Sequence, residues 1–171
     1  RGDQWGRFNP ERAVTRAEFA TLLVRTLGFE RATPAQPTFP DVAPTDWFYD
    51  DAEAVARAGL IQGAAGQFRP LDTIARQEMA AILARTLRQR GESAGLPAAT
   101  SEALRSAASP EAVEAILSGV ADGAEVAPWA KADVALTHQL GLLKGRSGSR
   151  YEPQASATRL EAVVALKRLL D

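Results

Sequence analysis

The fold is decided by residues 8–18, which read FNPERAVTRAE. The same arrangement recurs in residues 68–78, FRPLDTIARQE, and in residues 151–161, YEPQASATRLE. In each stretch an aromatic residue is followed two positions later by Pro, eight positions later by Arg and ten positions later by Glu. Self-similarity at fixed offsets is the signature of a repeat protein. The sequence therefore predicts three copies of one module.

Two of the copies carry a further set of matching residues upstream. The set consists of a Trp and two Gly residues 12 and 16 positions later: Trp47, Gly59 and Gly63, then Trp129, Gly141 and Gly145. An Asp precedes each Trp, Asp41 by six positions and Asp122 by seven. The third copy has drifted most at this start, where it reads VAD (residues 120–122) and the second copy reads FPDV (residues 39–42).

Each module is predicted to form a helix, a glycine-containing loop and a second helix. The stretch after each Trp is rich in Ala and ends at a Gly, as helix C-termini do. The second helix begins after Thr15 or Thr158, each of which forms a capping box with a Glu three positions later, whereas the middle copy has Ala75 there. Apolar residues at helical spacing then predict a core stripe: Phe19, Leu23 and Leu27, then Met79, Leu83 and Leu87, then Ala162, Leu166 and Leu170.

Composition excludes several classes of function. The 171 residues are 46% hydrophobic with a formal net charge of -1, so the chain is expected to fold and lacks the basic surface of nucleic-acid-binding proteins. It has no Cys and one His, His138, which argues against a zinc site, a thiol nucleophile and a disulfide. Apolar runs such as 162–166 are far shorter than the roughly 20 residues of a membrane span. We therefore expect no membrane span, no metal, no cofactor and no catalytic centre.

The repeated motifs resemble those of the S-layer homology domain family, which has an Asp-containing start, a Trp-led helix, a Gly-rich loop with an aromatic residue and Pro, and a helix beginning Thr-Arg-Ala-Glu. The resemblance places half of a first repeat at 1–28, a second repeat at 39–87 and a third at 120–171. It implies an all-α fold in which tandem helix-loop-helix repeats form a pseudo-threefold, three-pronged spindle around a central helix bundle. The Ala-rich insertion at 88–119 is predicted to contain a helix, with Ser109 as its cap and Pro110 in its first turn.

The resemblance also implies a function. It indicates a bacterial anchoring module, not an enzyme, that binds secondary cell-wall polysaccharide non-covalently in grooves between repeats, through sugars that carry a pyruvate ketal. It implies a secreted protein at the cell wall or S-layer, of which this chain is one part, with the signal peptide outside the chain. The alternative is a helical-repeat module that binds another protein and no carbohydrate.

The candidate ligand-binding residues are those that repeat in register: Arg16, Arg76 and Arg159; Trp47 and Trp129; Gly63 and Gly145; Asp41 and Asp122. Arg suits a ketal carboxylate because its guanidinium group makes two parallel hydrogen bonds, and a helix N-terminus adds favourable charge. The alternative is that each Arg is a solvated surface residue; under the ligand interpretation, changing all three to Ala removes binding and leaves the fold intact.

The Trp and Asp residues have structural interpretations as well. Stacking of Trp on a sugar face competes with packing in the core, which we favour because few other large apolar residues anchor those helices. For the Asp residues we favour hydrogen bonds to nearby backbone. The copies also differ, since Leu160 replaces the motif Ala, so the three grooves are not expected to be equivalent. Separately, the apolar stripe of the first copy is expected to lack one helical neighbour.

Overall fold

The computed structural model describes residues 7–31, 33–94, 97–147 and 149–171. In these ranges the chain forms seven α-helices and two short 3-10 turns, and its only β-pairings are isolated bridges. The all-α class predicted from the sequence is confirmed. The chain divides into two compact units, Arg1–Ile74 with Ala157–Val163, and Ala75–Ser156 with Val164–Asp171.

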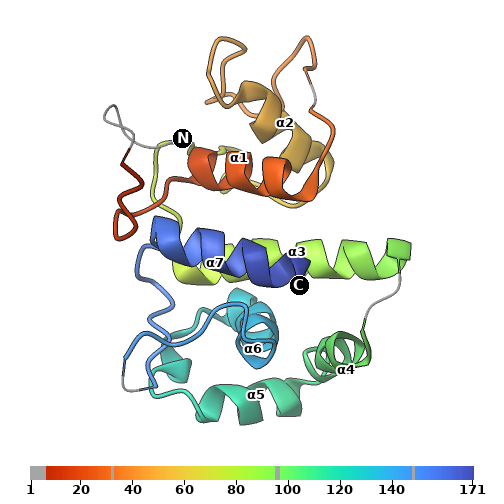
Figure 1. Cartoon of the computed structure of the whole chain (residues 1–171), viewed down its shortest axis with the longest axis vertical. Coiled ribbons are helices and arrows are strands. Elements are labelled where there is room, and N and C mark those ends of the chain that lie inside the picture. Colours follow the sequence, from red (N-terminus) through yellow and green to blue (C-terminus); the bar gives the residue numbers. More distant parts are fainter. Residues whose placement is uncertain (1–6, 32, 95–96, 148) are drawn as a thin grey trace. The chain divides into compact units, whose positions relative to one another are not determined.

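The first unit contains α1 (Arg16–Leu27), α2 (Tyr49–Arg57) and the start of α7 (Arg159–Leu170). The predicted capping box of α1 is present, because Thr15 Oγ1 accepts a 3.2 Å hydrogen bond from Glu18 N and Thr15 N donates a 3.0 Å bond to Glu18 Oε2. Helices α1 and α2 pack against each other (Figure 1). Phe19 and Leu23 are fully buried. The expectation that this stripe lacks a helical neighbour is wrong, because α2 of the second repeat covers α1.

Three chain segments meet in the core of the first unit through a closed ring of backbone hydrogen bonds. Val14 N donates to Ala157 O (2.9 Å), Ala157 N donates to Ile74 O (2.8 Å) and Ile74 N donates to Val14 O (3.0 Å). All three residues are fully buried. Each lies directly before the capping position of the second helix in its copy, at residue 15, 75 or 158. The three repeats therefore meet at equivalent residues.

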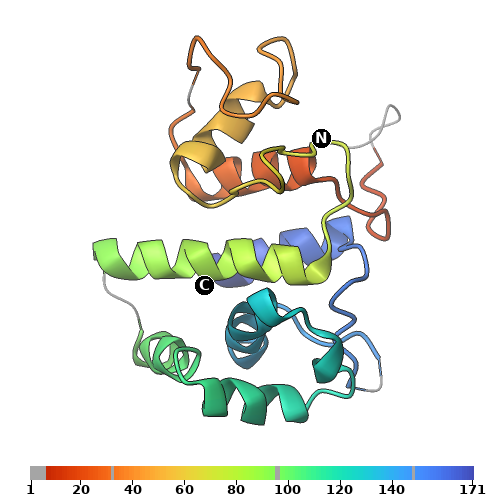
Figure 2. The same ribbon diagram turned by 180° about the vertical axis from the view of Figure 1, so that it is seen from behind.

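The second unit is built around α6 (Lys131–Gln139). This helix contacts α3 (Arg76–Ala94), α4 (Ala98–Ser106) and α5 (Pro110–Ser118), as Figure 2 shows from behind. The 3-10 turns Gly123–Glu125 and Pro128–Ala130 lead into α6. The predicted ends of the Trp-led helices are confirmed, since α2 and α6 are each followed by a glycine with positive φ, Gly59 at 67° and Gly141 at 66°.

The insertion forms two helices where one was predicted. The cap of α5 is as expected, with Ser109 Oγ accepting a 3.3 Å hydrogen bond from Ala112 N. Helix α4 was missed because it begins after Pro97, which offers no side-chain cap. Val113 and Leu117 of α5 are buried, so the insertion covers part of α6. Among the described residues no helix is both long enough and apolar enough to cross a membrane.

Candidate functional site

The motif Arg of the first repeat binds the loop of the second repeat. Arg16 is the first residue of α1, and its side chain is 4% exposed. Its Nε donates a 2.7 Å hydrogen bond to Phe68 O, and its guanidinium carbon lies 5.8 Å from the centroid of the Phe68 ring. The N–H groups of Arg16 and Ala17 donate to the carbonyls of Asp72 and Pro70. Arg16 is therefore not a solvated surface residue.

Asp41 holds the same loop from the other side. Its two carboxylate oxygens accept hydrogen bonds from Phe68 N (2.8 Å) and Arg69 N (2.7 Å). The Phe68 residue is thus fixed twice, its N–H by Asp41 and its C=O by Arg16. Bonds from ionised groups to backbone are stronger than neutral ones, so this arrangement makes a rigid loop. It bears out the structural interpretation of Asp41, with a partner farther along the chain than a local turn.

The second unit contains the corresponding arrangement around Arg76. This side chain is 1% exposed, and its guanidinium carbon lies 4.8 Å from the Tyr151 ring centroid. Its Nε donates to Tyr151 O and its Nη2 donates to Lys144 O, both at 2.7 Å. Arg76 N donates to Ala155 O at 2.9 Å, as Arg16 N does to Asp72 O. A buried guanidinium group with backbone acceptors is a structural element of this loop.

Asp122 takes the role of Asp41 in the second unit. Its Oδ1 accepts a 2.6 Å hydrogen bond from Tyr151 N, and its Oδ2 accepts a 2.8 Å bond from Glu152 N. Burial alone would raise the pKa of Asp122, but these two N–H groups, with the Arg150 guanidinium nearby, lower the pKa below its ordinary value. The extra residue between Asp122 and its Trp does not disturb the contact that Asp122 makes.

The residue after each aromatic side chain has left-handed backbone. The φ angles are 49° for Asn9, 56° for Arg69 and 56° for Glu152. A non-glycine residue with this φ persists only where its surroundings hold it. Asp41 and Asp122 stabilise this conformation, because the Oδ2 atom of each accepts a hydrogen bond from the backbone N–H of Arg69 or Glu152. Asn9 belongs to a residue type that tolerates this conformation.

Arg159 makes a more open version of the site in the first unit. Its guanidinium carbon lies 5.3 Å from the Phe8 ring centroid, but Phe8 is 43% exposed, whereas the aromatic residues of the other two sites are fully buried. Arg159 Nη1 lies 3.2 Å from Glu18 Oε1, and Glu18 also pairs with Arg12. Burial alone would raise the pKa of Glu18, but the Thr15 N–H and the two guanidinium groups lower it, which keeps this carboxylate ionised.

Gly63 and Gly145 are required by the loops themselves. A Cβ at Gly63 would lie 2.6 Å from Gln67 O, and one at Gly145 would lie 2.8 Å from Arg150 O. Gln67 and Arg150 are the residues directly before the aromatic side chains, so both loops fold back onto their glycine, and the loop of the third repeat does so over one more residue. Any larger residue would push the loop open.

Trp47 and Trp129 lie at the surface. Their exposed fractions are 64% and 58%, so the prediction that they pack in the core is wrong. The ring of Trp47 lies nearly perpendicular to the ring of its neighbour Phe48, with the centroids 5.3 Å apart. Other buried side chains anchor the Trp-led helices, among them Tyr49 and Val55 of α2 and Val134 of α6. Both indole rings are open to a ligand.

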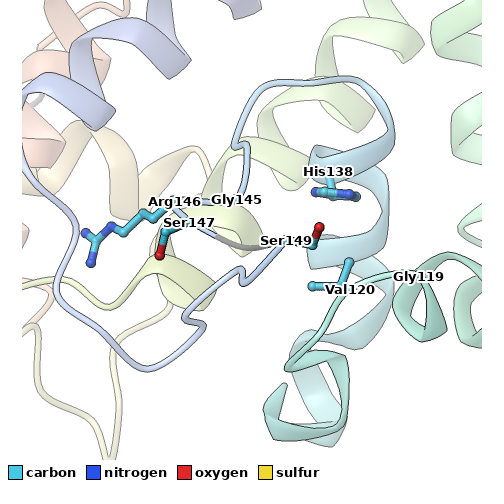
Figure 3. Close-up of a pocket in the computed structure, with 7 residues that line it drawn as sticks. All are labelled: Gly119, Val120, His138, Gly145, Arg146, Ser147 and Ser149. Atoms are coloured by element: carbon cyan, nitrogen blue, oxygen red, sulfur yellow. The ribbon is translucent and has the colours of Figure 1, made fainter.

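Sequence reasoning missed a pocket in the third repeat. It has a volume of about 280 Å³ and lies between α6, loop residues 145–147 and 149, and the chain just before Asp122 (Figure 3). It is lined by Gly119, Val120, His138, Gly145, Arg146, Ser147 and Ser149. No role was predicted for His138, because the sequence contains no second His, no Cys and no nucleophile motif to act with it. In the part of the chain that the structure describes, no group of three or more His, Asp or Glu residues could hold a metal ion.

Comparison with known proteins places this architecture in a family. The model of the S-layer homology domain matches residues 1–20, 38–80 and 121–163, more than half of the chain. An amylopullulanase of Thermoanaerobacterium thermosulfurigenes is 31% identical over 96% of this chain and 8% of its own length. Exoglucanase XynX of Acetivibrio thermocellus is 30% identical over 96% of this chain and 13% of its own length. The surface-layer 125 kDa protein of Lysinibacillus sphaericus is 29% identical over 99% of this chain and 13% of its own length. The chain thus spans a small part of each of these relatives.

Proposed function

The chain belongs to the S-layer homology domain family, and on that premise we propose that it anchors a larger secreted protein to the bacterial cell wall or S-layer. Its relatives include two proteins named as enzymes and one named as a surface-layer protein. A segment common to such different proteins, and a small part of each, serves a purpose that they share. Attachment is such a purpose. The module itself is not an enzyme in this proposal.

The ligand in this proposal is secondary cell-wall polysaccharide. The observation that carries it is the exposure of Trp47 and Trp129, at equivalent positions of two repeats. A broad indole face left open to water suits stacking against the C–H face of a sugar ring. One such indole face in each of two repeats suits a ligand made of repeated sugars, because each repeat can bind one of its units.

The finer arrangement is part of the same proposal. The repeats at 1–28, 39–87 and 120–171 form three prongs with pseudo-threefold symmetry, and the polysaccharide occupies the grooves between them. The hydrogen-bonded ring of residues 14, 74 and 157 supports this symmetry. In this proposal Asp41 and Asp122 shape the groove loops through their carboxylates, and Gly63 and Gly145 do so by allowing close approach of the backbone.

The motif arginines have two roles in the proposal. Arg16 and Arg76 are nearly buried and bind loop carbonyls, so they act on the ligand by fixing the loop. Arg159 has a side chain that is 14% exposed and is the best placed to bind the carboxylate of a pyruvate ketal. Glu18 competes for this guanidinium group, so Glu18→Gln, which keeps the capping acceptor, is expected to tighten binding of a ketal-bearing ligand.

Sedimentation with purified cell walls tests the proposal. Three wall preparations are compared: intact walls, walls with the ketal groups removed, and walls stripped of the polysaccharide. We expect the protein to pellet with intact walls, to pellet less without the ketals and to stay in solution without the polysaccharide. Equal pelleting with stripped walls would contradict carbohydrate binding and favour a protein partner.

A further inference from the structure

The glycine loop of the third repeat is one residue longer than that of the second repeat, and the side chain beneath it also differs. In the second repeat the Phe39 ring is 6% exposed and lies 5.4 Å, centroid to centroid, from the Phe68 ring. Its Cε1 atom comes within 2.8 Å of the place where a Cβ on Gly63 would stand. Phe39 therefore fills the space beneath the glycine loop. Val120 holds the same position in the third repeat, two residues before Asp122 as Phe39 is two before Asp41.

The shorter Val120 leaves that space open. The three atoms nearest to a Cβ on Gly145 all belong to Ser149 and Arg150, and none to Val120. The loop does not collapse to fill the gap, because Arg146 N still donates to Arg150 O at 2.9 Å, as Ala64 N does to Gln67 O at 2.8 Å in the second repeat. Beside Val120, under a loop one residue longer than that of the second repeat, lies the pocket of about 280 Å³ in Figure 3.

His138 gives this pocket a polar wall. It stands nine residues after Trp129, where the second repeat has Ala56 nine residues after Trp47. The imidazole ring meets the Tyr151 ring edge to face with centroids 6.3 Å apart. Its Nδ1 atom is buried and has no hydrogen-bond partner among the described residues. A buried polar atom of this kind costs free energy until a ligand or water satisfies it.

The remaining lining makes the pocket neutral. Figure 3 shows the imidazole of His138 and the side chain of Ser149 facing each other, with Val120 beside them and Arg146 directed away. Arg146 is paired with Glu152, whose Oε2 lies 2.9 Å from its Nη1, so its charge is compensated outside the pocket. The pocket is therefore lined by a hydroxyl group, an imidazole ring and an apolar side chain. This combination suits a ligand with hydroxyl groups on an uncharged, partly apolar ring.

We propose that this pocket is a subsite for one neutral sugar residue, whose hydroxyl groups bind the imidazole of His138 and Ser149 Oγ while its C–H face lies on Val120. The proposal rests on the proposed function in that it takes the ligand class to be a glycan. Pockets for drug-sized ligands are roughly 300–1,000 Å³, so this one matches a single sugar ring rather than an oligosaccharide. The subsite belongs to the third repeat alone, because Phe39 fills the equivalent space in the second.

Nuclear magnetic resonance of the imidazole tests the subsite directly, because His138 is the one His of the chain. The probes are glucose, galactose and N-acetylglucosamine. At millimolar concentration we expect at least one of them to shift the His138 ring signals in a saturable way. Val120→Phe, which restores the side chain of the second repeat, is expected to abolish the shift, whereas Leu71→Phe on the exposed surface leaves it unchanged.

A second variant tests the subsite independently, in case Val120→Phe does not fold. His138→Phe keeps a ring against Tyr151 and removes Nδ1, and the backbone signals of Gly145 and Ser149 then report binding. We expect these signals to respond to the sugar at least tenfold more weakly than in the unchanged protein. The inference is wrong if no probe shifts His138, or if both pocket variants bind as the unchanged protein does.

Sedimentation with walls separates this inference from the proposed function. Val120→Phe is expected to bind intact walls about fivefold more weakly and still measurably, because the exposed Trp residues remain. If the unchanged protein does not bind walls while a monosaccharide shifts His138, the anchoring function fails and the subsite stands. Wall binding by the unchanged protein without any effect of a monosaccharide on His138 contradicts the subsite and leaves the anchoring function in place.

Discussion

The loops of the second and third repeats are held by the same set of hydrogen bonds from Asp and Arg, here called the frame, and differ in the side chain beneath the loop. In both, an Asp carboxylate accepts two backbone N–H bonds and a buried Arg donates to the carbonyl of the aromatic residue. In one the space beneath the loop holds Phe39, and in the other it is a pocket beside Val120. The charged hydrogen bonds to the aromatic residue are the same in both repeats, although the side chain beneath the loop and the length of the loop differ. The frame and the contents of the site are therefore separable.

The largest expected effect is on the frame. The sequence alone suggested that Arg76 could be replaced by Ala without harm to the fold. Because Arg76 is buried, we now expect its removal to destabilise the protein. Arg76→Ala loses two hydrogen bonds from a charged group, so we expect the free energy of unfolding to fall by about 3 to 5 kcal/mol in a denaturant titration. Arg159→Ala, at the more exposed site, is expected to cost about 1 kcal/mol. Equal losses for both variants would show that the two sites are built alike.

Phe39→Val gives the second repeat the side chain that the third repeat has beneath its loop, at Val120. A buried Phe replaced by a smaller apolar residue leaves a cavity, and we expect a loss of about 2 to 3 kcal/mol in thermal or denaturant unfolding. The reverse change, Val120→Phe, is expected to be neutral or to stabilise the protein by up to about 1 kcal/mol because it fills a cavity. Strong destabilisation by Val120→Phe would mean that the two loops do not share one frame.

Low pH is expected to lower the free energy of unfolding by protonating Asp122, whose carboxylate holds the loop of the third repeat. Its pKa is lowered in the folded protein, so the ionised carboxylate stabilises the fold above the ordinary pKa of about 3.9. This contribution is lost as the pH falls through the lowered pKa. Asp122→Asn is expected to cost about 2 kcal/mol at pH 7 and much less at pH 2. The measurement is urea unfolding of both proteins at each pH, and a cost that does not depend on pH would rule out the charged interaction.

The smallest expected effect concerns the start of α3. Ala75 N donates a 2.9 Å bond to Glu78 Oε2, as Thr158 N does to Glu161 Oε2, so half of the capping box is already present. Ala offers no side-chain acceptor for the other half. Ala75→Thr is expected to add about 1 kcal/mol to the free energy of unfolding, whereas Ala75→Val, of similar shape, is not. No difference between these two variants would mean that the helix start is satisfied in another way.

Local chemistry made much of the fold predictable. Thr15 and Ser109 mark helix starts because their side-chain oxygens satisfy backbone donors, and the glycines after α2 and α6 mark helix ends. Helix α4 escaped prediction because Ala-rich sequence without a polar cap gives no such signal. The interval from aromatic residue to Arg also indicated a repeated contact. It could not show that each Arg lies over the aromatic ring of a different repeat, since that partner is far away in sequence.

The errors at the site have a common physical origin. Residue type suggested that Arg lies outside and Trp inside, but Arg76 is 1% exposed and Trp47 is 64% exposed. Each Arg is buried because loop carbonyls accept its hydrogen bonds, and such tertiary partners leave no trace in local sequence. The pocket beside His138 was missed for the same reason. The replacement of Phe by Val at residue 120 was visible, but only the position of the Phe39 ring reveals the space that it leaves.

The double variant Trp47→Ala and Trp129→Ala tests the central claim most directly, because both side chains are exposed and their removal spares the core. If the indole rings stack on sugars at about 1 kcal/mol each, affinity for polysaccharide-bearing walls should fall on the order of 30-fold. The thermal midpoint should not change, and Leu71→Ala, which removes another exposed apolar side chain, should bind walls normally. Unchanged wall binding by the double variant would contradict the claim that these exposed tryptophans anchor the protein to the cell-wall polysaccharide.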